Sequence, residues 1–210
     1  MAILGGLLIS AACNRGVLRP PAESVRPMNA SPSTTNAGAI APTPAHVGPR
    51  NAALSDSDLD ALWERQLMVP VAGMVRASLH DDFTSKRGSD RIHGALDILA
   101  SRSTPVLAPD DCVIGRMFAG PVGGIVIYAT DVTSHFVYYF AHLDGYLLGL
   151  AVGDRVAKGS VIGYVGSTGN ASADTPHLHF QVMKRGAGRA WWDGPPINPV
   201  SFFALDGFRP

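Results

Sequence analysis

The 210-residue chain has few cysteines, no excess of either charge and no long apolar run at its start. Its 17 basic residues equal its 17 acidic residues, whereas a nucleic-acid binder normally shows a basic face. The apolar run from Ala2 to Ala12 is far shorter than the ~20 residues that a membrane-spanning helix needs. The chain also contains no His-Glu-x-x-His motif, so the glutamate base of many metalloproteases is missing.

Residues 1 to 13 resemble a bacterial lipoprotein signal. The apolar run ends at Ser10-Ala11-Ala12-Cys13, and the resemblance implies that Cys13 becomes the lipidated first residue of the mature chain. A buried apolar strand is the alternative for this segment. An anchoring role for Cys13 leaves Cys112 without a disulfide partner. Cys112 begins a short apolar run and is predicted to be a small core residue.

The next two segments differ in composition. Residues 14 to 50 are rich in Pro, Ala, Ser and Thr and have almost no large apolar side chains, so they are predicted to form a disordered tether. Residues 51 to 66 contain a predicted short helix, in which acidic capping residues precede Leu59, Leu62 and Trp63 at helical spacing. This apolar stripe is expected to pack on the following domain.

Residues 67 to 210 are predicted to form an all-β, sandwich-like domain of antiparallel sheets. The 23 Gly and 16 Pro of the chain favour turn-rich β structure. Several strand-like runs follow one another closely, each bounded by Pro, Gly or Asp, which indicates antiparallel pairing. These runs cover residues 104 to 108, 112 to 118, 124 to 129 and 135 to 143.

The segment Thr175 to Val182 alternates between polar and apolar side chains. In an extended strand, His177, His179 and Gln181 point to one face, and the apolar residues between them point to the other. One face of the strand is therefore predicted to pack in the core, and the other is predicted to present the polar side chains of a functional site. Taken alone, a His-x-His pair in a strand is more often exposed than metal-binding.

The segment Ile92 to Ile98 is predicted to repeat this pattern. His93 and Asp97 share one face, and the apolar residues Ile92, Leu96 and Ile98 share the other. Two such strands together present three histidines and one aspartate. Imidazoles and one carboxylate, without a thiolate, are the ligand set of a catalytic zinc site that keeps one position open for water.

These motifs resemble the lysostaphin-type zinc endopeptidases, which cut peptide bridges in bacterial cell walls. The resemblance covers about residues 69 to 202. It rests on three motifs in the family's order: His93-x-x-x-Asp97, Ala141-His142-Leu143 and Pro176-His177-Leu178-His179-Phe180. The family usually has Gly midway between the first His and the Asp, whereas this chain has Gly94 one place earlier and Ala95 in the middle.

The resemblance implies a role for each of these residues. His93, Asp97 and His179 bind Zn²⁺, while His142 and His177 flank the metal without coordinating it. A neutral imidazole can take the proton of the attacking water, and the other histidine can stabilise the oxyanion. Which of the two has which role stays open. By strand alternation, His135 lies on the face opposite His142 and is not expected to join the site.

The implied function is hydrolysis of the peptide cross-links of peptidoglycan, and two alternatives stay open. Folds of this family also serve as non-catalytic scaffolds that bind and activate other wall hydrolases, although such scaffolds generally lack part of the ligand set. The segment 152 to 163, with Lys158 at a turn, loosely resembles the hairpin of a swinging-arm carrier. A carrier function does not require the histidine motifs.

A lipid anchor at Cys13 suits an enzyme that is held at a membrane and faces the periplasm of a Gram-negative-type bacterium. The thin wall there has direct bonds between stem peptides, typically from D-alanine to meso-diaminopimelate. We therefore expect these stem peptides to be the substrate, rather than glycine bridges.

Trp191 and Trp192 lie in a Gly/Pro-rich connection, where they either line a substrate groove or cap the core.

Overall fold

The structure is a computed structural model that describes residues 54–88, 90–187 and 191–205, all within the unit Ala41–Pro210. Cys13 and the tether predicted at residues 14 to 50 lie outside the described residues and stay predictions. Within the described ranges, no helix is long and apolar enough to cross a membrane. The elements are α1 (Asp56–Glu64), β1 (Lys86–Arg87), β2 (Arg91–Ile92), β3 (Leu96–Leu99), β4 (Pro105–Leu107), β5 (Cys112–Gly120), β6 (Gly124–Asp131), β7 (Phe136–Tyr146), β8 (Arg155–Val156), β9 (Val161–Val165), β10 (His177–Lys184) and β11 (Pro196–Ile197), with 3-10 turns at Arg76–Ser78 and Val200–Phe202.

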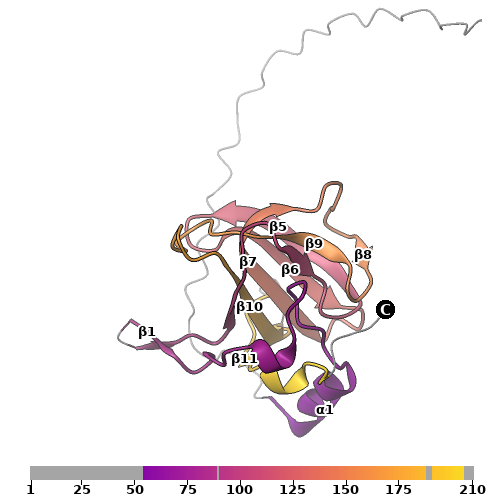
Figure 1. The fold of residues 1–210 in the computed structure, drawn as a ribbon. Coiled ribbons are helices and arrows are strands. Elements are labelled where there is room, and N and C mark those ends of the chain that lie inside the picture. The colour runs from indigo at the N-terminus through magenta and orange to yellow at the C-terminus, as the bar shows by residue number, and fades with distance from the viewer. Residues whose placement is uncertain (1–53, 89, 188–190, 206–210) are drawn as a thin grey trace, which may run out of the picture. The chain divides into compact units, whose positions relative to one another are not determined.

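Among the described residues, nine strands form one antiparallel sheet, which confirms the predicted all-β domain with one short α-helix. Its main order is β11-β10-β7-β6-β5-β8, with β3 paired to β10 and β9 paired to both β7 and β4. Figure 1 shows the long strands β5, β6, β7 and β10 side by side, with the short β1–β2 hairpin projecting from the sheet. The five histidine and aspartate candidates all lie on β3, β7 and β10 or next to β3.

The two faces of the sheet bury different side chains. The alternation predicted for β10 is present: Leu178 and Phe180 are fully buried in the main core, while His177 and His179 on the other face remain partly exposed. On that second face lies a smaller apolar group, which we call the second cluster. Its buried members are Val126, Tyr128, Val137, Ala141 and Met183, and Phe118, Tyr139, Trp191 and Trp192 pack against it.

The helix α1 begins where the acidic residues predict it. Ser55 is its N-cap, and Ser55 and Asp58 exchange hydrogen bonds with each other's backbone N–H in a capping box. Leu62 is fully buried, as the predicted stripe requires. Trp63 is 53% exposed, and its ring centroid lies 6.2 Å from that of Phe202 in a T-shaped arrangement. The helix therefore packs on the β domain through Leu62 and the partly buried Leu59, as predicted, and through the polar contacts of Asp58.

Asp58 is expected to stabilise this docking at neutral pH. Its buried carboxylate accepts hydrogen bonds from Lys184 at 2.8 Å and from His135 at 2.6 Å. The hydrogen bond from Lys184 is the main cause that holds the pKa of Asp58 well below its usual 3.8. A lowered pKa in the folded state stabilises the protein above about pH 4, and this contribution is lost as the pH falls further.

We predict that Asp58→Asn lowers the free energy of unfolding at pH 7 by about 2 kcal/mol, because it leaves the partly buried ammonium group of Lys184 without its charge partner. The difference from wild type should shrink below about pH 4. Urea unfolding at pH 7 and pH 3 measures both values. Asp56→Asn, at an exposed position in the same helical turn, is the matched control. Equal losses at both pH values would show that Asp58 does not act through its charge.

Candidate active site

The structure brings together the three predicted zinc ligands. Nε2 of His93 lies 3.1 Å from Oδ1 of Asp97, and Nδ1 of His179 lies 2.9 Å from the same oxygen. The two nitrogens are 3.1 Å apart. In a tetrahedral zinc site with bonds of about 2.0–2.1 Å, ligand atoms are separated by about 3.3 Å. The three donor atoms therefore already approximate one face of a zinc tetrahedron, and the donor set fits the metal.

Strand pairing places two of these ligands opposite each other. In the antiparallel pair of β3 and β10, Asp97 is directly opposite His179, so both side chains stand on the same face of the sheet. On its other side, His179 is opposite Ala141 of β7. The carboxylate and the imidazole therefore meet because of register, which joins residues that are 82 positions apart.

The position of His93 corrects the predicted strand from Ile92 to Ile98. The strand β3 begins only at Leu96, because Gly94 adopts a left-handed φ of +67° that ends the extended run. Ile92 is consequently 53% exposed instead of lying in the core. The turn is fixed by Gln181, whose side-chain amide donates to the Gly94 carbonyl at 2.9 Å. His93 thus reaches the site from a turn rather than from the shared face of a strand.

Asp82, which the sequence reasoning missed, orients His93 by contacting Nδ1, the ring nitrogen that does not face Asp97 and His179. Nδ1 of His93 lies 3.3 Å from the Asp82 carbonyl oxygen and 3.2 Å from its carboxylate. An imidazole that donates from Nδ1 keeps the lone pair of Nε2 free, and carboxylates commonly hold metal-binding histidines in this way. Asp82 lies in a loop, and its separation of eleven residues from His93 carries no recognisable spacing signal.

The charge state of the cluster suits a cation. Burial alone raises the pKa of Asp97, but hydrogen bonds from His179 and His93 outweigh this and hold it well below its usual range. Burial lowers the pKa of His179, so that its imidazole is neutral. The ionised carboxylate of Asp97 beside the neutral imidazole of His179 is the protonation state that metal binding requires.

His142 and His177 face each other at the edge of this cluster. Their ring centroids are 4.9 Å apart, and Nε2 of His177 lies 3.8 Å from Oδ1 of Asp97. Each ring donates from Nδ1 to a backbone carbonyl at 2.8 Å, His142 to Thr168 and His177 to Thr175. These two bonds fix the tautomer: in the neutral form of each ring, Nε2 is the proton acceptor. Burial also lowers the pKa of His142 to about 4.

A bulge in β7 directs His142 to the site. Simple alternation places residue 142 on the same face as Phe140, which is in the main core. His142 instead has a left-handed φ of +61°, and the pairing of β7 with β6 shifts register nearby. Leu143 returns to the core after this one extra residue. His142 therefore shares the face of His179, with ring centroids 5.8 Å apart.

Gly124 allows the Thr168 loop to reach His142. A Cβ atom at Gly124 would lie 2.4 Å from the Thr168 carbonyl carbon, and Gly124 has a left-handed φ of +66°. The Thr168 hydroxyl accepts from the N–H of Ile125 at 2.9 Å and donates to the Leu143 carbonyl at 2.7 Å. These contacts hold the carbonyl that orients His142.

The remaining candidates of the sequence lie elsewhere. His135 bonds to Asp58 of α1 and so stays outside the site as predicted, although the bulge at His142 means that alternation is not the reason. Trp191 and Trp192 pack on the second cluster, where their rings lie 6.3 and 6.5 Å from Tyr128. They therefore cap an apolar cluster on the site face of the sheet. Cys112 is fully buried, and burial raises the pKa of its thiol to about 12, as expected for a core residue.

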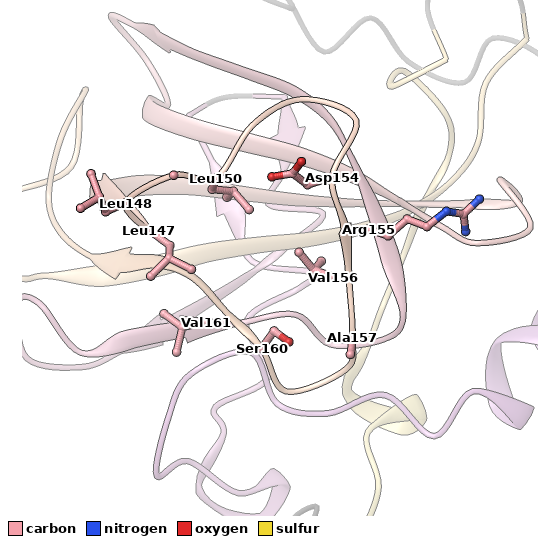
Figure 2. A pocket seen from close by; sticks show the side chains of 10 residues that line it. Leu147, Leu148, Leu150, Asp154, Arg155, Val156, Ala157, Ser160 and Val161 are labelled. Carbon is pink, nitrogen blue, oxygen red and sulfur yellow. The ribbon is translucent and has the colours of Figure 1, made fainter.

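The carrier-like segment 152 to 163 has no free lysine. The Lys158 ammonium group donates to the backbone carbonyls of Arg65 and Gln66, at 2.7 and 3.1 Å. The same segment forms one wall of a surface pocket (Figure 2), whose lining is mainly aliphatic and contains no histidine. Lys158 thus connects the end of α1 to the domain, which argues against the carrier hypothesis.

Arg87 of β1 is a second residue that the sequence reasoning missed. Its guanidinium pairs with Oδ2 of Asp97, and Nη2 lies 3.2 Å from Nε2 of His93. The same Nε2 lone pair is the one available to a metal. Arg87 therefore competes with a bound cation for these two ligands and repels it electrostatically.

We predict that Arg87→Ala increases zinc affinity about tenfold, because the competing guanidinium is removed. Titration against a chromogenic chelator measures this affinity without reference to activity. Lys86→Ala, an exposed change of equal charge on the same strand, is the control. A weaker affinity in Arg87→Ala would show instead that the guanidinium holds Asp97 in position for the metal.

Residues 91–199, just over half of the chain, match the model of peptidase family M23. The chain belongs to this family. The match confirms the resemblance to lysostaphin-type enzymes, and it covers all five site residues. The matched residues therefore form a domain of a peptidase family.

Two curated M23 relatives and one solved structure illustrate the match. The chain is 36% identical over 114 residues to the L-Ala–D-Glu endopeptidase of Bacillus subtilis, covering 52% of this chain and 34% of the relative. It is 37% identical over 116 residues to the DD-carboxypeptidase/endopeptidase Mpg of Neisseria meningitidis, covering 53% of this chain and 23% of the relative. Helicobacter pylori Csd3 has a TM-score of 0.50 and 27% identity, covering 65% of this chain and 33% of that one. The M23 chain thus matches about a third or less of each relative's length.

Proposed function

We propose that this M23 chain is a zinc-dependent endopeptidase that hydrolyses the peptide cross-links of peptidoglycan. One observation carries the proposal: three donor atoms lie 2.9–3.1 Å apart in near-tetrahedral spacing, beside two histidines with oriented Nε2 acceptors. Relatives of the chain are named as endopeptidases, among them the L-Ala–D-Glu endopeptidase of Bacillus subtilis and a peptidoglycan DD-endopeptidase of Vibrio cholerae. A non-catalytic scaffold has no need for this complete set of five side chains.

His93, Asp97 and His179 would hold the zinc ion, which would supply a Lewis acid and lower the pKa of a bound water to about 7. The histidines of this chain provide the proton transfer. His142 and His177 each donate from Nδ1 to a backbone carbonyl, which leaves Nε2 as the acceptor of the neutral ring, so one of them can accept the proton of the attacking water. The other, once protonated, can donate to the developing oxyanion or to the leaving amine.

The substrate we propose is a direct cross-link between stem peptides, from D-alanine to meso-diaminopimelate. A further part of the proposal is that Cys13 carries a lipid anchor, which holds the domain on the periplasmic side of a Gram-negative-type envelope. The names of the DD-endopeptidase relatives from Neisseria and Vibrio support the bond type. Stable anchoring requires more than one acyl chain, which a lipoprotein cysteine provides.

Purified cross-linked muropeptide dimers and pentaglycine decide between the candidate activities. The full chain, loaded with zinc, is expected to convert dimers to monomers and to leave pentaglycine intact, with fragment masses identifying the bond cut. Chelation should stop the reaction, and added zinc should restore it. Cleavage of pentaglycine alone would overturn the substrate assignment. Zinc-loaded protein that cuts neither peptide, yet stimulates another wall hydrolase, would establish the scaffold instead.

A further inference from the structure

A cationic side chain stands on the active-site face of the sheet, three strands away from His179. Strand register places four residues directly opposite one another in a row: Gln181 of β10, Tyr139 of β7, Tyr128 of β6 and Arg116 of β5. Directly opposed residues of antiparallel strands share a face. Gln181 is two positions from His179 on the same face, so Arg116 belongs to the surface that carries the histidines.

The guanidinium of Arg116 is held between two aromatic rings. Its central carbon lies 4.3 Å from the ring centroid of Phe118 and 4.6 Å from that of Trp192. Such cation–π contacts restrict the rotamers of a long side chain. Gly115, at the bulge of β5, lets Trp191, the chain neighbour of Trp192, approach the strand, because a Cβ atom there would lie 2.5 Å from the Trp191 ring. Arg116 is therefore fixed in place before any ligand arrives.

Within the described ranges, Arg116 forms no ion pair, and Asp193, whose charge, like that of Arg116, acts on Tyr128, is exposed. By contrast, Arg65, Arg87 and Arg102 all pair with aspartates. Stacking uses the flat faces of a guanidinium, whereas its N–H donors lie in the plane of the group. These donors remain available, in the planar arrangement that matches a carboxylate.

We propose that Arg116, with Phe118 and Trp192, forms a subsite that binds a free carboxylate of the peptide substrate. This inference rests on the proposed function and adds to it a determinant of substrate choice. Strands are spaced by about 4.8 Å, so β5 lies about 14 Å from β10, which corresponds to roughly four residues of extended peptide. A carboxylate within about four residues of the scissile bond reaches this subsite. In stem peptides it belongs to the C-terminus, to isoglutamate or to the diamino acid.

Binding of synthetic stem peptides to the full chain tests the subsite. The probes are L-alanyl-D-isoglutamyl-meso-diaminopimelyl-D-alanine with all carboxylates free, and three versions in which the C-terminal, isoglutamate or diaminopimelate carboxylate is an amide. In calorimetry, one amide should bind wild type about 10- to 100-fold more weakly than the free acid, since a charge-assisted bidentate contact is lost. The amide that shows this loss identifies which carboxylate is bound.

Arg116→Gln should weaken binding of the free acid by the same factor and leave binding of that amide unchanged. Arg116→Lys keeps the charge without the planar pair of donors and should give an intermediate loss. Arg155→Gln, an exposed arginine on β8, controls for the change in net charge. Unchanged thermal unfolding and zinc content show that the variants are folded. In cleavage assays, Arg116→Gln should raise KM for dimers and leave kcat unchanged.

Equal binding of the acid and all amides by wild type, or equal weakening of every peptide in Arg116→Gln, would overturn the subsite. These outcomes do not depend on turnover. A chain that discriminates acid from amide through Arg116 but cuts no dimer would retain the subsite while refuting the proposed function. A chain that cuts dimers without such discrimination would retain the function and refute the subsite.

Discussion

His179→Ala is expected to reduce bound zinc from one ion per chain to a small fraction and to lower turnover by at least about 10³-fold. Nδ1 of His179 is within 3.1 Å of both other candidate ligands, so its loss leaves only two donors. Two protein ligands are fewer than the three of a typical catalytic zinc site, and the metal supplies both the nucleophile and the Lewis acid. Elemental analysis after dialysis, together with the dimer cleavage assay, measures the two effects.

His80→Ala is the matched control for this variant, because His80 is exposed and outside the described site. It should keep both zinc and turnover. His179 lies opposite Asp97 in the β3–β10 pair, so circular dichroism and thermal unfolding should verify that the sheet is intact. Full zinc occupancy in folded His179→Ala would remove this residue from the ligand set.

His142→Ala and His177→Ala are each expected to keep zinc and to lower turnover by about 10²- to 10⁴-fold, the usual range for loss of an acid–base group. Both rings stand beside the three donor atoms, and in both Nδ1 donates to a backbone carbonyl, which leaves Nε2 as the acceptor nitrogen. Their combined replacement should cost much less than the product of the single effects, because the two groups act on one reaction. Steady-state kinetics with dimers, at verified zinc content, measures all three variants.

The control for His142→Ala targets the contact that orients its ring. Thr168→Ser keeps the carbonyl that accepts from Nδ1 of His142 and also keeps the hydroxyl, so it should retain activity. Full turnover in either single His→Ala variant would leave that histidine without a proton-transfer role. Loss of zinc in His177→Ala would instead make His177 part of the ligand set, consistent with its 3.8 Å approach to Asp97.

Local alternation was sufficient to predict much of this protein. The side chains of β10 divide into core and site faces because neighbouring residues of any extended strand point in opposite directions, whatever the strand pairs with. The acidic start of α1 and the buried Leu62 likewise follow from capping and helical spacing, which involve only nearby residues. These features need no knowledge of the rest of the chain.

The geometry of the site was decided by contacts that alternation does not contain. Gly94 ends the strand that His93 and Asp97 were expected to share, and the left-handed backbone of His142 reverses the face that counting predicts. Both are single-residue departures whose direction depends on what packs beside them, here Gln181 and the Thr168 loop. Sequence periodicity averages over such departures and cannot reveal them.

The sequence by itself thus determined which residue types are available for a metal, in which order, and which face of β10 carries them. Only the tertiary structure decided that Asp97 stands opposite His179, that Asp82 and Arg87 come from a loop and a hairpin to contact them, and that Arg116 shares their face. The physical reason is the range of the interactions. Side-chain direction is set by the local backbone, whereas strand register depends on hydrogen bonds between segments far apart in the chain.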